Sequence, residues 1–121
     1  MEFPRDAAPS RDALLAAIER LARSRPTAVH LPWAMARLRR VVEAAPAGAP
    51  LLDALTAEAE RILAEDAAMC DAIGRHGAAL LADGARVLTH CNAGALATAG
   101  IGTALAPVYT AVAAGRRVEV I

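Results

Sequence analysis

Lysine is absent from this chain of 121 residues, and its 13 basic residues are all arginines. The 13 acidic residues balance them, so the charge does not indicate a nucleic-acid partner, which would favour a basic surface. Aromatic residues make up only 2% of the chain, whereas 56% of it is hydrophobic. The core must therefore be built from Ala, Leu, Val and Ile. Because Ala and Leu favour helix strongly, the composition predicts a mainly helical protein.

Cysteine is also scarce, and only Cys70 and Cys91 are present. A disulfide scaffold of this length would need more. The first residues, MEFPRDAAPSRD, lack the apolar run of a signal peptide. The longest weakly polar stretch, residues 93–114, includes glycines, a proline and threonines, which fit a loop and helix better than a membrane span. We therefore expect a soluble, cytoplasmic protein with no membrane partner.

Hydrophobic periodicity predicts three helices in the first part of the chain. Ser10 is the expected N-cap of a helix over 11–24, which Pro26 ends. A second helix is expected over 31–45 and a long third one over roughly 51–81, with the proline-rich break APAGAP between them. These segments form the helical region that we predict for residues 1–82.

Four residues of these helices carry further expectations. Arg37 is expected to face solvent, as charged residues on helices usually do, and Glu58 is one of the polar residues that interrupt the apolar positions of the third helix. Gly74 and Gly77 weaken the third helix by about 1 kcal/mol each relative to alanine. A helix that keeps two glycines is expected to have another part of the backbone close by.

Residues 83–121 read as a β-α-β unit. The expected elements are the turn Asp83-Gly84, a strand over 85–90, a small-residue loop over 91–102, a helix over 103–114 and a strand over 117–121. Such a unit has parallel strands, and two parallel strands cannot bury both faces of a sheet. We therefore predict that residues 83–121 are the start of a Rossmann-like parallel α/β domain that is incomplete in this chain.

Cys91 lies at the carboxyl end of the first predicted strand, where α/β proteins bind ligands. His90 precedes it, and Gly94, Gly100 and Gly102 follow in the loop. A thiolate is favoured near helix N-termini, and glycine backbone can come close to an anion. The alternatives are a small buried cysteine and a tight turn that packs closely. Spacing alone leaves both open.

Arg25 precedes Pro26 in the corner between the first two helices. A guanidinium there could hold a phosphate through two parallel hydrogen bonds, or it could simply be solvated. The sequence also contains possible metal ligands in Cys70, His76, His90 and Cys91. Because they form neither Cys-x-x-Cys nor His-Glu-x-x-His, we expect no metal site.

Three segments resemble the methylthioribose-1-phosphate isomerases of methionine salvage. THCNAGALATAGIGTAL, residues 89–105, is similar to the cysteine loop of that family. SRPTAVHLPWAMARL, residues 24–38, is similar to its Arg-Pro-Thr-Ala-Val-Asn-Leu segment, and EDAAMCDAIGRHGAALL, residues 65–81, to the acidic helix before its first Rossmann-like strand. The motif Thr-His-Cys-Asn-Ala-Gly is specific. Related ribose-1,5-bisphosphate isomerases share only its first part, and regulatory subunits of the initiation guanine-nucleotide exchange factor lack its cysteine.

The resemblance implies an aldose–ketose isomerase that needs no metal or cofactor and acts on a small phosphorylated sugar. It would convert 5-methylthioribose 1-phosphate to 5-methylthioribulose 1-phosphate. Cys91 matches the catalytic cysteine, which works with an aspartate by proton transfer or a hydride shift. Arg25 matches a substrate-contacting arginine, and Asn92, Ala93 and Gly94 would line the substrate pocket. Full-length members of the family are expected to be homodimers.

The chain also departs from the family pattern. The Arg-Gly-Ala-Pro-Ala-Ile-Gly segment is expected before residue 1, and the catalytic aspartate and an Asn-Lys segment after Ile121. His30 stands where the family usually has asparagine. We therefore expect a piece truncated at both ends that is inactive by itself. Two alternatives are a ribose-1,5-bisphosphate isomerase-like enzyme and a non-catalytic regulatory or interaction module of the same superfamily.

Overall fold

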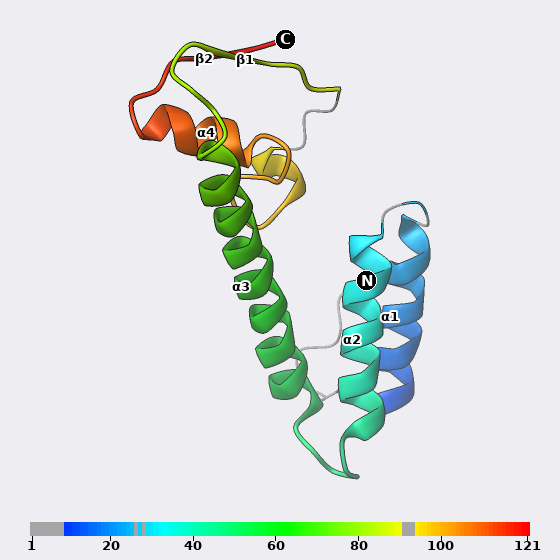
Figure 1. Ribbon diagram of the computed structural model, residues 1–121. Helices are drawn as coiled ribbons and strands as arrows, with labels where there is room; N and C mark the ends of the chain where they lie inside the picture. Colours follow the sequence, from blue (N-terminus) through cyan, green and yellow to red (C-terminus); the bar gives the residue numbers. More distant parts are fainter. Residues whose placement is uncertain (1–8, 26, 28, 91–93) are drawn as a thin grey trace. The chain divides into compact units, whose positions relative to one another are not determined.

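The computed structural model of this protein describes residues 9–25, 27, 29–90 and 94–121 (Figure 1). The elements are α1 (Arg11–Ser24), α2 (His30–Ala44), α3 (Leu51–Ala78), β1 (Ala85–Val87), the 3-10 helix η1 (Ala95–Ala97), α4 (Ala106–Ala113) and β2 (Val118–Val120). The fold is mainly helical with a small parallel sheet of two strands, as the sequence predicts. Each helix of the first part lies within three residues of its predicted bounds.

Two compact units make up the chain, unit 1 over Met1–Ile62 and unit 2 over Leu63–Ile121. The boundary falls inside α3, so one helix contributes its first turns to unit 1 and its later turns to unit 2. The predicted division between residues 82 and 83 concerns the domains of a larger protein and stays a prediction. The units are described one at a time below.

Unit 1 is built on the packing of α1 against α2, which lie side by side (Figure 1). The Ser10 hydroxyl accepts a hydrogen bond from the Ala13 N–H at 3.2 Å, which confirms the predicted N-cap. The core consists of Leu14, Ile18, Met35 and Val42, and Leu51 and Leu55 of α3 pack against it. At one end of the pair, Arg11 donates to the Glu43 carbonyl at 3.2 Å and to that of Ala45, which satisfies carbonyl groups that the end of α2 leaves open.

Glu58 of α3 is a buried carboxylate. It is only 6% exposed, and its Oε1 lies 2.6 Å from Nε of Arg37, whose side chain is 16% exposed. Arg61, one turn further along α3, pairs with the other oxygen. The Arg37 guanidinium also lies 5.0 Å from the centre of the Trp33 ring. The expectation that Arg37 faces solvent is therefore wrong, because α2 and α3 enclose its ion pair with Glu58, and two guanidinium groups compensate the buried carboxylate.

Unit 2 contains the predicted β-α-β unit. The strands are parallel, with Ala85 opposite Val118 and Val87 opposite Val120, as predicted. β1 is shorter than the predicted strand over 85–90, although its pairing continues through hydrogen bonds from the Thr89 N–H to the Ile121 carbonyl, 3.1 Å, and from the Ile121 N–H to the Val87 carbonyl, 2.9 Å. The two strands form only a few hydrogen bonds with each other, because a two-stranded sheet with little packed against it is only marginally stable.

The helix between the strands ends where the sequence predicts. Gly115 has a φ of +83°, and its N–H donates to Val112 at 2.9 Å while the N–H of Arg116 donates to Ala111 at 3.0 Å. This pair of bonds is the Schellman motif, which favours glycine at the left-handed position. The start of α4 at Ala106 is later than the predicted 103.

Gly74 and Gly77 of α3 lie against α4, which confirms the expected close approach. A Cβ at Gly74 would collide with the Thr110 hydroxyl and lie 3.3 Å from the Ala106 carbonyl oxygen. A Cβ at Gly77 would collide with the Pro107 ring, with its Cβ at 2.8 Å. The two helices therefore pack at a distance that only glycine allows.

Gly77→Ala is expected to destabilise the protein, although alanine is the better helix former. The gain in helix propensity is about 1 kcal/mol. Overpacking against a rigid proline ring costs about 1–3 kcal/mol, so the net change in unfolding free energy is a loss. Thermal unfolding followed by circular dichroism measures it. The matched test is Gly77→Ala in a Pro107→Gly background, where both ring carbons that a Cβ at Gly77 would meet within 3 Å are gone and the substitution should be neutral or stabilising. A lower stability in that background too would show that the contact is not the cause.

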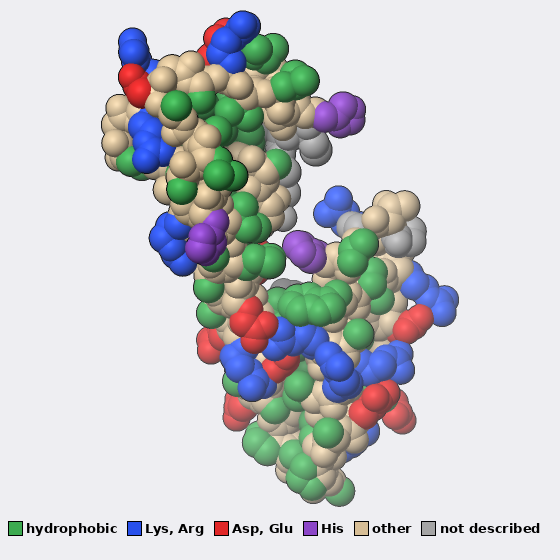
Figure 2. Space-filling view, viewed as in Figure 1, with side chains coloured by type: hydrophobic (Ala, Val, Ile, Leu, Met, Phe, Trp, Pro, Cys, Tyr) green, Lys and Arg blue, Asp and Glu red, His purple; other side chains and the backbone are tan. Residues whose placement is uncertain are grey.

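Large hydrophobic side chains of unit 2 reach the surface around the strands and α4 (Figure 2). Those more than 40% exposed include Leu80, Leu88, Tyr109, Val112, Val120 and Ile121. This partial cover is what two parallel strands with a single crossover helix are expected to show. Within the described part of the chain, none of the helices combines the length and the apolarity that crossing a membrane requires.

Candidate functional site

The candidate site is the loop that leaves the carboxyl end of β1. His90 is exposed and follows the last paired residue of the strand. Cys91, Asn92 and Ala93 lie outside the described residues, so their predicted roles stay predictions. Gly94 is the first described residue of the loop; it is buried and precedes η1 in an extended conformation, with φ −103° and ψ −160°. The structure thus places one of the four predicted loop residues.

The loop lies against α3 within unit 2. The Ala99 N–H donates to Oδ2 of Asp66 at 2.7 Å, and the Thr98 hydroxyl donates to the Gly100 carbonyl at 3.2 Å. A Cβ at Gly100 would lie 3.1 Å from the Cβ of Cys70, which is fully buried. For Gly100 the structure therefore favours the close-packing alternative over direct contact with an anion.

Asp66 is the residue of this site whose role the sequence does not show. By spacing it is one of several acidic residues on a helix, for which the usual interpretation is a solvated face. Its contact with Ala99 spans 33 positions of the sequence. No local signal marks such a contact, because it depends on how the loop folds back onto α3.

Arg25 belongs to unit 1, where it follows the last residue of α1 and is exposed. Its backbone is non-helical, with φ −139° and ψ 74°, as expected for a residue before proline. Its guanidinium is therefore accessible to a ligand. His30, at the family's asparagine position, begins α2, and its ring lies 6.4 Å from that of Trp33.

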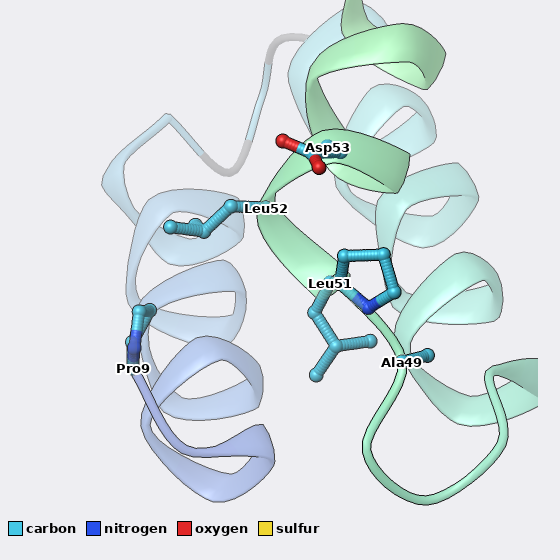
Figure 3. Close-up of a pocket in the computed structure, with 6 residues that line it drawn as sticks. Pro9, Ala49, Leu51, Leu52 and Asp53 are labelled. Carbon is cyan, nitrogen blue, oxygen red and sulfur yellow. The ribbon is translucent and has the colours of Figure 1, made fainter. Parts of the chain in front are cut away.

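Two hollows in the surface are poor candidates for binding a sugar phosphate. The one in unit 1, about 190 Å³, is lined by Pro9, Ala49, Pro50, Leu51, Leu52 and Asp53 (Figure 3). Its charged group is a carboxylate, which would repel a phosphate. The other, about 330 Å³, is lined by Gly84, Arg117, Val118 and Glu119. It lies at the amino ends of the strands, whereas α/β proteins bind ligands at the carboxyl ends.

Arg117 of the second hollow already has a partner. Its guanidinium donates to Oδ2 of Asp83 at 2.9 Å, and its backbone N–H donates to Oδ1 at 2.8 Å. These bonds hold the pKa of Asp83 below its ordinary value of 3.8, and the bond from the Arg117 side chain has the largest effect. The pair joins the turn before β1 to the residue before β2, so it supports the register of the sheet.

The stability that Asp83 contributes is expected to depend on pH. A carboxyl group whose pKa is lowered by folding stabilises the native state above its unfolded-state pKa, and this contribution is lost as the pH falls through the folded-state value. Asp83→Asn should therefore lower the melting temperature at pH 7, by a small amount because the pair is exposed, and the difference should begin to shrink near pH 3.8 and disappear as the pH falls through the lower folded-state pKa. Melting curves of both proteins from pH 7 to pH 2 measure it, with Asp71→Asn as the control. A difference that is constant over this range would contradict the ion pair.

Among the described residues, no three His, Cys, Asp or Glu side chains come close enough together to hold a metal ion. Cys70 is a free thiol and is buried. It packs beneath Gly100, so its observed contacts are those of a small core residue.

Comparisons with known proteins give a consistent result. The family model of the initiation factor 2 subunit family matches residues 2–121. The chain is 65% identical over 101 residues to the methylthioribose-1-phosphate isomerase of Gemmatimonas aurantiaca. This match covers 84% of this chain and 29% of that protein. It is also 53% identical over 118 residues to the 5-deoxyribose 1-phosphate isomerase of Moorella thermoacetica, and this match covers 96% of this chain and 34% of that protein.

A solved structure has the same fold. The crystal structure of the translation initiation factor eIF-2B, subunit delta, from A. fulgidus superimposes with a TM-score of 0.77 and 36% identity, over 96% of this chain and 36% of that one. The chain thus spans about a third of the length of the relatives that it matches.

Proposed function

The chain belongs to the initiation factor 2 subunit family, and we propose that it is the cysteine-loop portion of a methylthioribose-1-phosphate isomerase. The observation that carries this proposal is the 65% identity to the relative of that name, together with the motif Thr-His-Cys-Asn-Ala-Gly at residues 89–94. By the resemblance, this motif distinguishes methylthioribose-1-phosphate isomerases from the related isomerases, which share only its first part, and from the regulatory subunits, which lack its cysteine.

The proposed reaction moves one hydrogen from C2 of the sugar to C1, so no oxidant or reductant is consumed. Cys91 is the group proposed to carry that proton, or to assist a hydride shift between the two carbons. Arg25, whose guanidinium is exposed, would bind the phosphate on C1 through two parallel hydrogen bonds. Asn92, Ala93 and Gly94 would line the pocket, where glycine lets the backbone come close to the substrate.

The 121 residues alone are proposed to be inactive. The resemblance implies that the cysteine works with an aspartate, which is expected after Ile121. A general acid or base typically contributes a factor of about 10²–10⁴ to the rate, so a site with one of its two groups falls far short of turnover.

The β-α-β unit is proposed to begin a larger Rossmann-like parallel sheet. The parallel pairing of β1 and β2, the crossover helix α4 and the exposed Leu88 and Val120 support this. We also propose that the full-length protein is a cytoplasmic homodimer. Two cysteines and no disulfide framework support a reducing compartment, and the family resemblance supports the dimer.

A chimera tests the proposed function. Residues 1–121 replace the matching segment of the Gemmatimonas aurantiaca isomerase, and NMR follows the conversion of 5-methylthioribose 1-phosphate to the ketose. We expect the chimera to be active, and the 121-residue chain alone and the relative without its segment to be inactive. A folded chimera without activity would contradict the proposal, and an active 121-residue chain would contradict its dependence on further residues.

Two relatives supply specific alternatives. The similarity to a 5-deoxyribose 1-phosphate isomerase favours a sugar without the methylthio group, and the ribose-1,5-bisphosphate reading requires a second phosphate. Comparing the kcat/KM of the chimera for the three sugars decides between them. The similarity to an initiation factor subunit favours a non-catalytic module, for which alkylation of Cys91 should follow the pH dependence of an ordinary thiol, with a pKa of about 8.5.

A further inference from the structure

We propose that Asp66 is a positioning residue that fixes the loop after Cys91 on helix α3. This inference rests on the proposed function, since it is that function which makes the loop a substrate site. The carboxylate of Asp66 is 2.7 Å from the Ala99 nitrogen, and the hydrogen bond joins a charged acceptor to a backbone donor. Bonds of this kind are about twice as strong as neutral ones.

A second contact stands beside this bond on the same helix. Gly100, the next residue of the loop, packs on the Cβ of Cys70 and lies near Ala67. Asp66 and Cys70 are four positions apart and so lie on one face of α3. The polar and the apolar contact together hold residues 99 and 100 of the loop.

The predicted substrate residues lie between two fixed points. On one side, the Thr89 N–H donates to the carbonyl of Ile121 at 3.1 Å, so the loop leaves a paired strand. On the other side, Ala99 and Gly100 are held on α3. Loss of the Asp66 bond releases one of these points and, with it, the described residues 94–98 that precede Ala99. A displacement of about 1 Å can lower catalysis by a factor of about 100.

The first measurement is amide exchange in the 121-residue chain. NMR follows the exchange of the Ala99 amide in the wild type, Asp66→Ala, Asp66→Asn and Asp71→Ala. Asp66→Ala removes the acceptor and should speed the exchange about tenfold, whereas Asp66→Asn keeps a carbonyl oxygen and should have a smaller effect. Asp71 is an exposed acidic residue of the same helix, and its variant should behave as the wild type. Unchanged exchange in Asp66→Ala would overturn the proposal.

The second measurement is catalysis by the chimera that carries residues 1–121. Asp66→Ala should lower kcat/KM by about tenfold per folded molecule. Asp66→Asn should recover most of it. A residue that only stabilised the fold would reduce the amount of folded chimera and leave the kcat of the remainder unchanged.

The outcomes separate this inference from the proposed function. If the wild-type chimera is active and Asp66→Ala keeps its kcat/KM, the positioning role is wrong and the isomerase proposal stands. If the folded wild-type chimera is inactive, the isomerase proposal is wrong, and so is the proposal that Asp66 positions its substrate loop. Faster exchange at Ala99 together with a lower kcat/KM that Asp66→Asn restores would support both.

Discussion

Cys91→Ser lowers the kcat of the chimera by about a thousandfold or more, which is the largest effect that we expect from a single substitution. The serine hydroxyl has nearly the size of the thiol but ionises far less readily, so it cannot carry a proton between C2 and C1 near neutral pH. KM should change little, because substrate binding is assigned to other groups. Steady-state kinetics with 5-methylthioribose 1-phosphate measures both constants.

Cys70→Ser in the same chimera is the matched control. Cys70 is buried beneath Gly100, and serine keeps the Cβ that this glycine contacts. We expect this variant to retain most of the activity, since the proposed mechanism assigns no proton transfer to its thiol. More than about a tenth of the wild-type kcat in Cys91→Ser would contradict a catalytic cysteine, because general acid–base groups contribute larger factors.

Glu58→Ala is expected to lower the unfolding free energy by about 3 kcal/mol, the largest effect that we expect on stability. Glu58 is 6% exposed and is the carboxylate that Arg37 and Arg61 both contact. Its removal leaves the Arg37 guanidinium, which is 16% exposed, without this counter-charge. Chemical denaturation of the 121-residue chain followed by circular dichroism measures the change.

Two further variants identify the cause of this effect. Glu60→Ala, on an exposed position of the same helix, should change the stability by about 0.5 kcal/mol or less. The double replacement Arg37→Met with Glu58→Leu should recover much of the loss, because apolar residues of similar volume often replace a buried ion pair at little cost. A double variant as unstable as Glu58→Ala would show that loss of the counter-charge to Arg37 is not the cause.

Local features of this protein follow from local sequence. Ser10 caps α1 because its hydroxyl reaches an N–H three residues away. Gly115 ends α4 because glycine adopts a positive φ at no steric cost. The parallel pairing of β1 and β2 follows from a strand, a helix and a strand in series. Each of these depends on residues within one element or on the order of elements, which the chain itself specifies.

The candidate site is predictable only in part. The motif that contains Cys91 and Gly94 and the corner that contains Arg25 can be found in the sequence, because both are contiguous. The contact of Asp66 with Ala99 cannot be found there, since 33 positions separate its partners. The sequence also predicts β1 and α4 to be longer than they are, because strand and helix ends depend on what the neighbouring backbone pairs with.

The sequence by itself determined which segments are helices and strands, where they are capped and which short motif carries the proposed chemistry. Only the tertiary structure decided which charged residues are buried and what they hold. Glu58 and Asp66 are two of several polar residues on one helix, yet one binds the guanidinium of Arg37 and the other the amide of Ala99. The reason is that both partners come from segments distant in the sequence, and a buried carboxylate such as Glu58 needs such compensation.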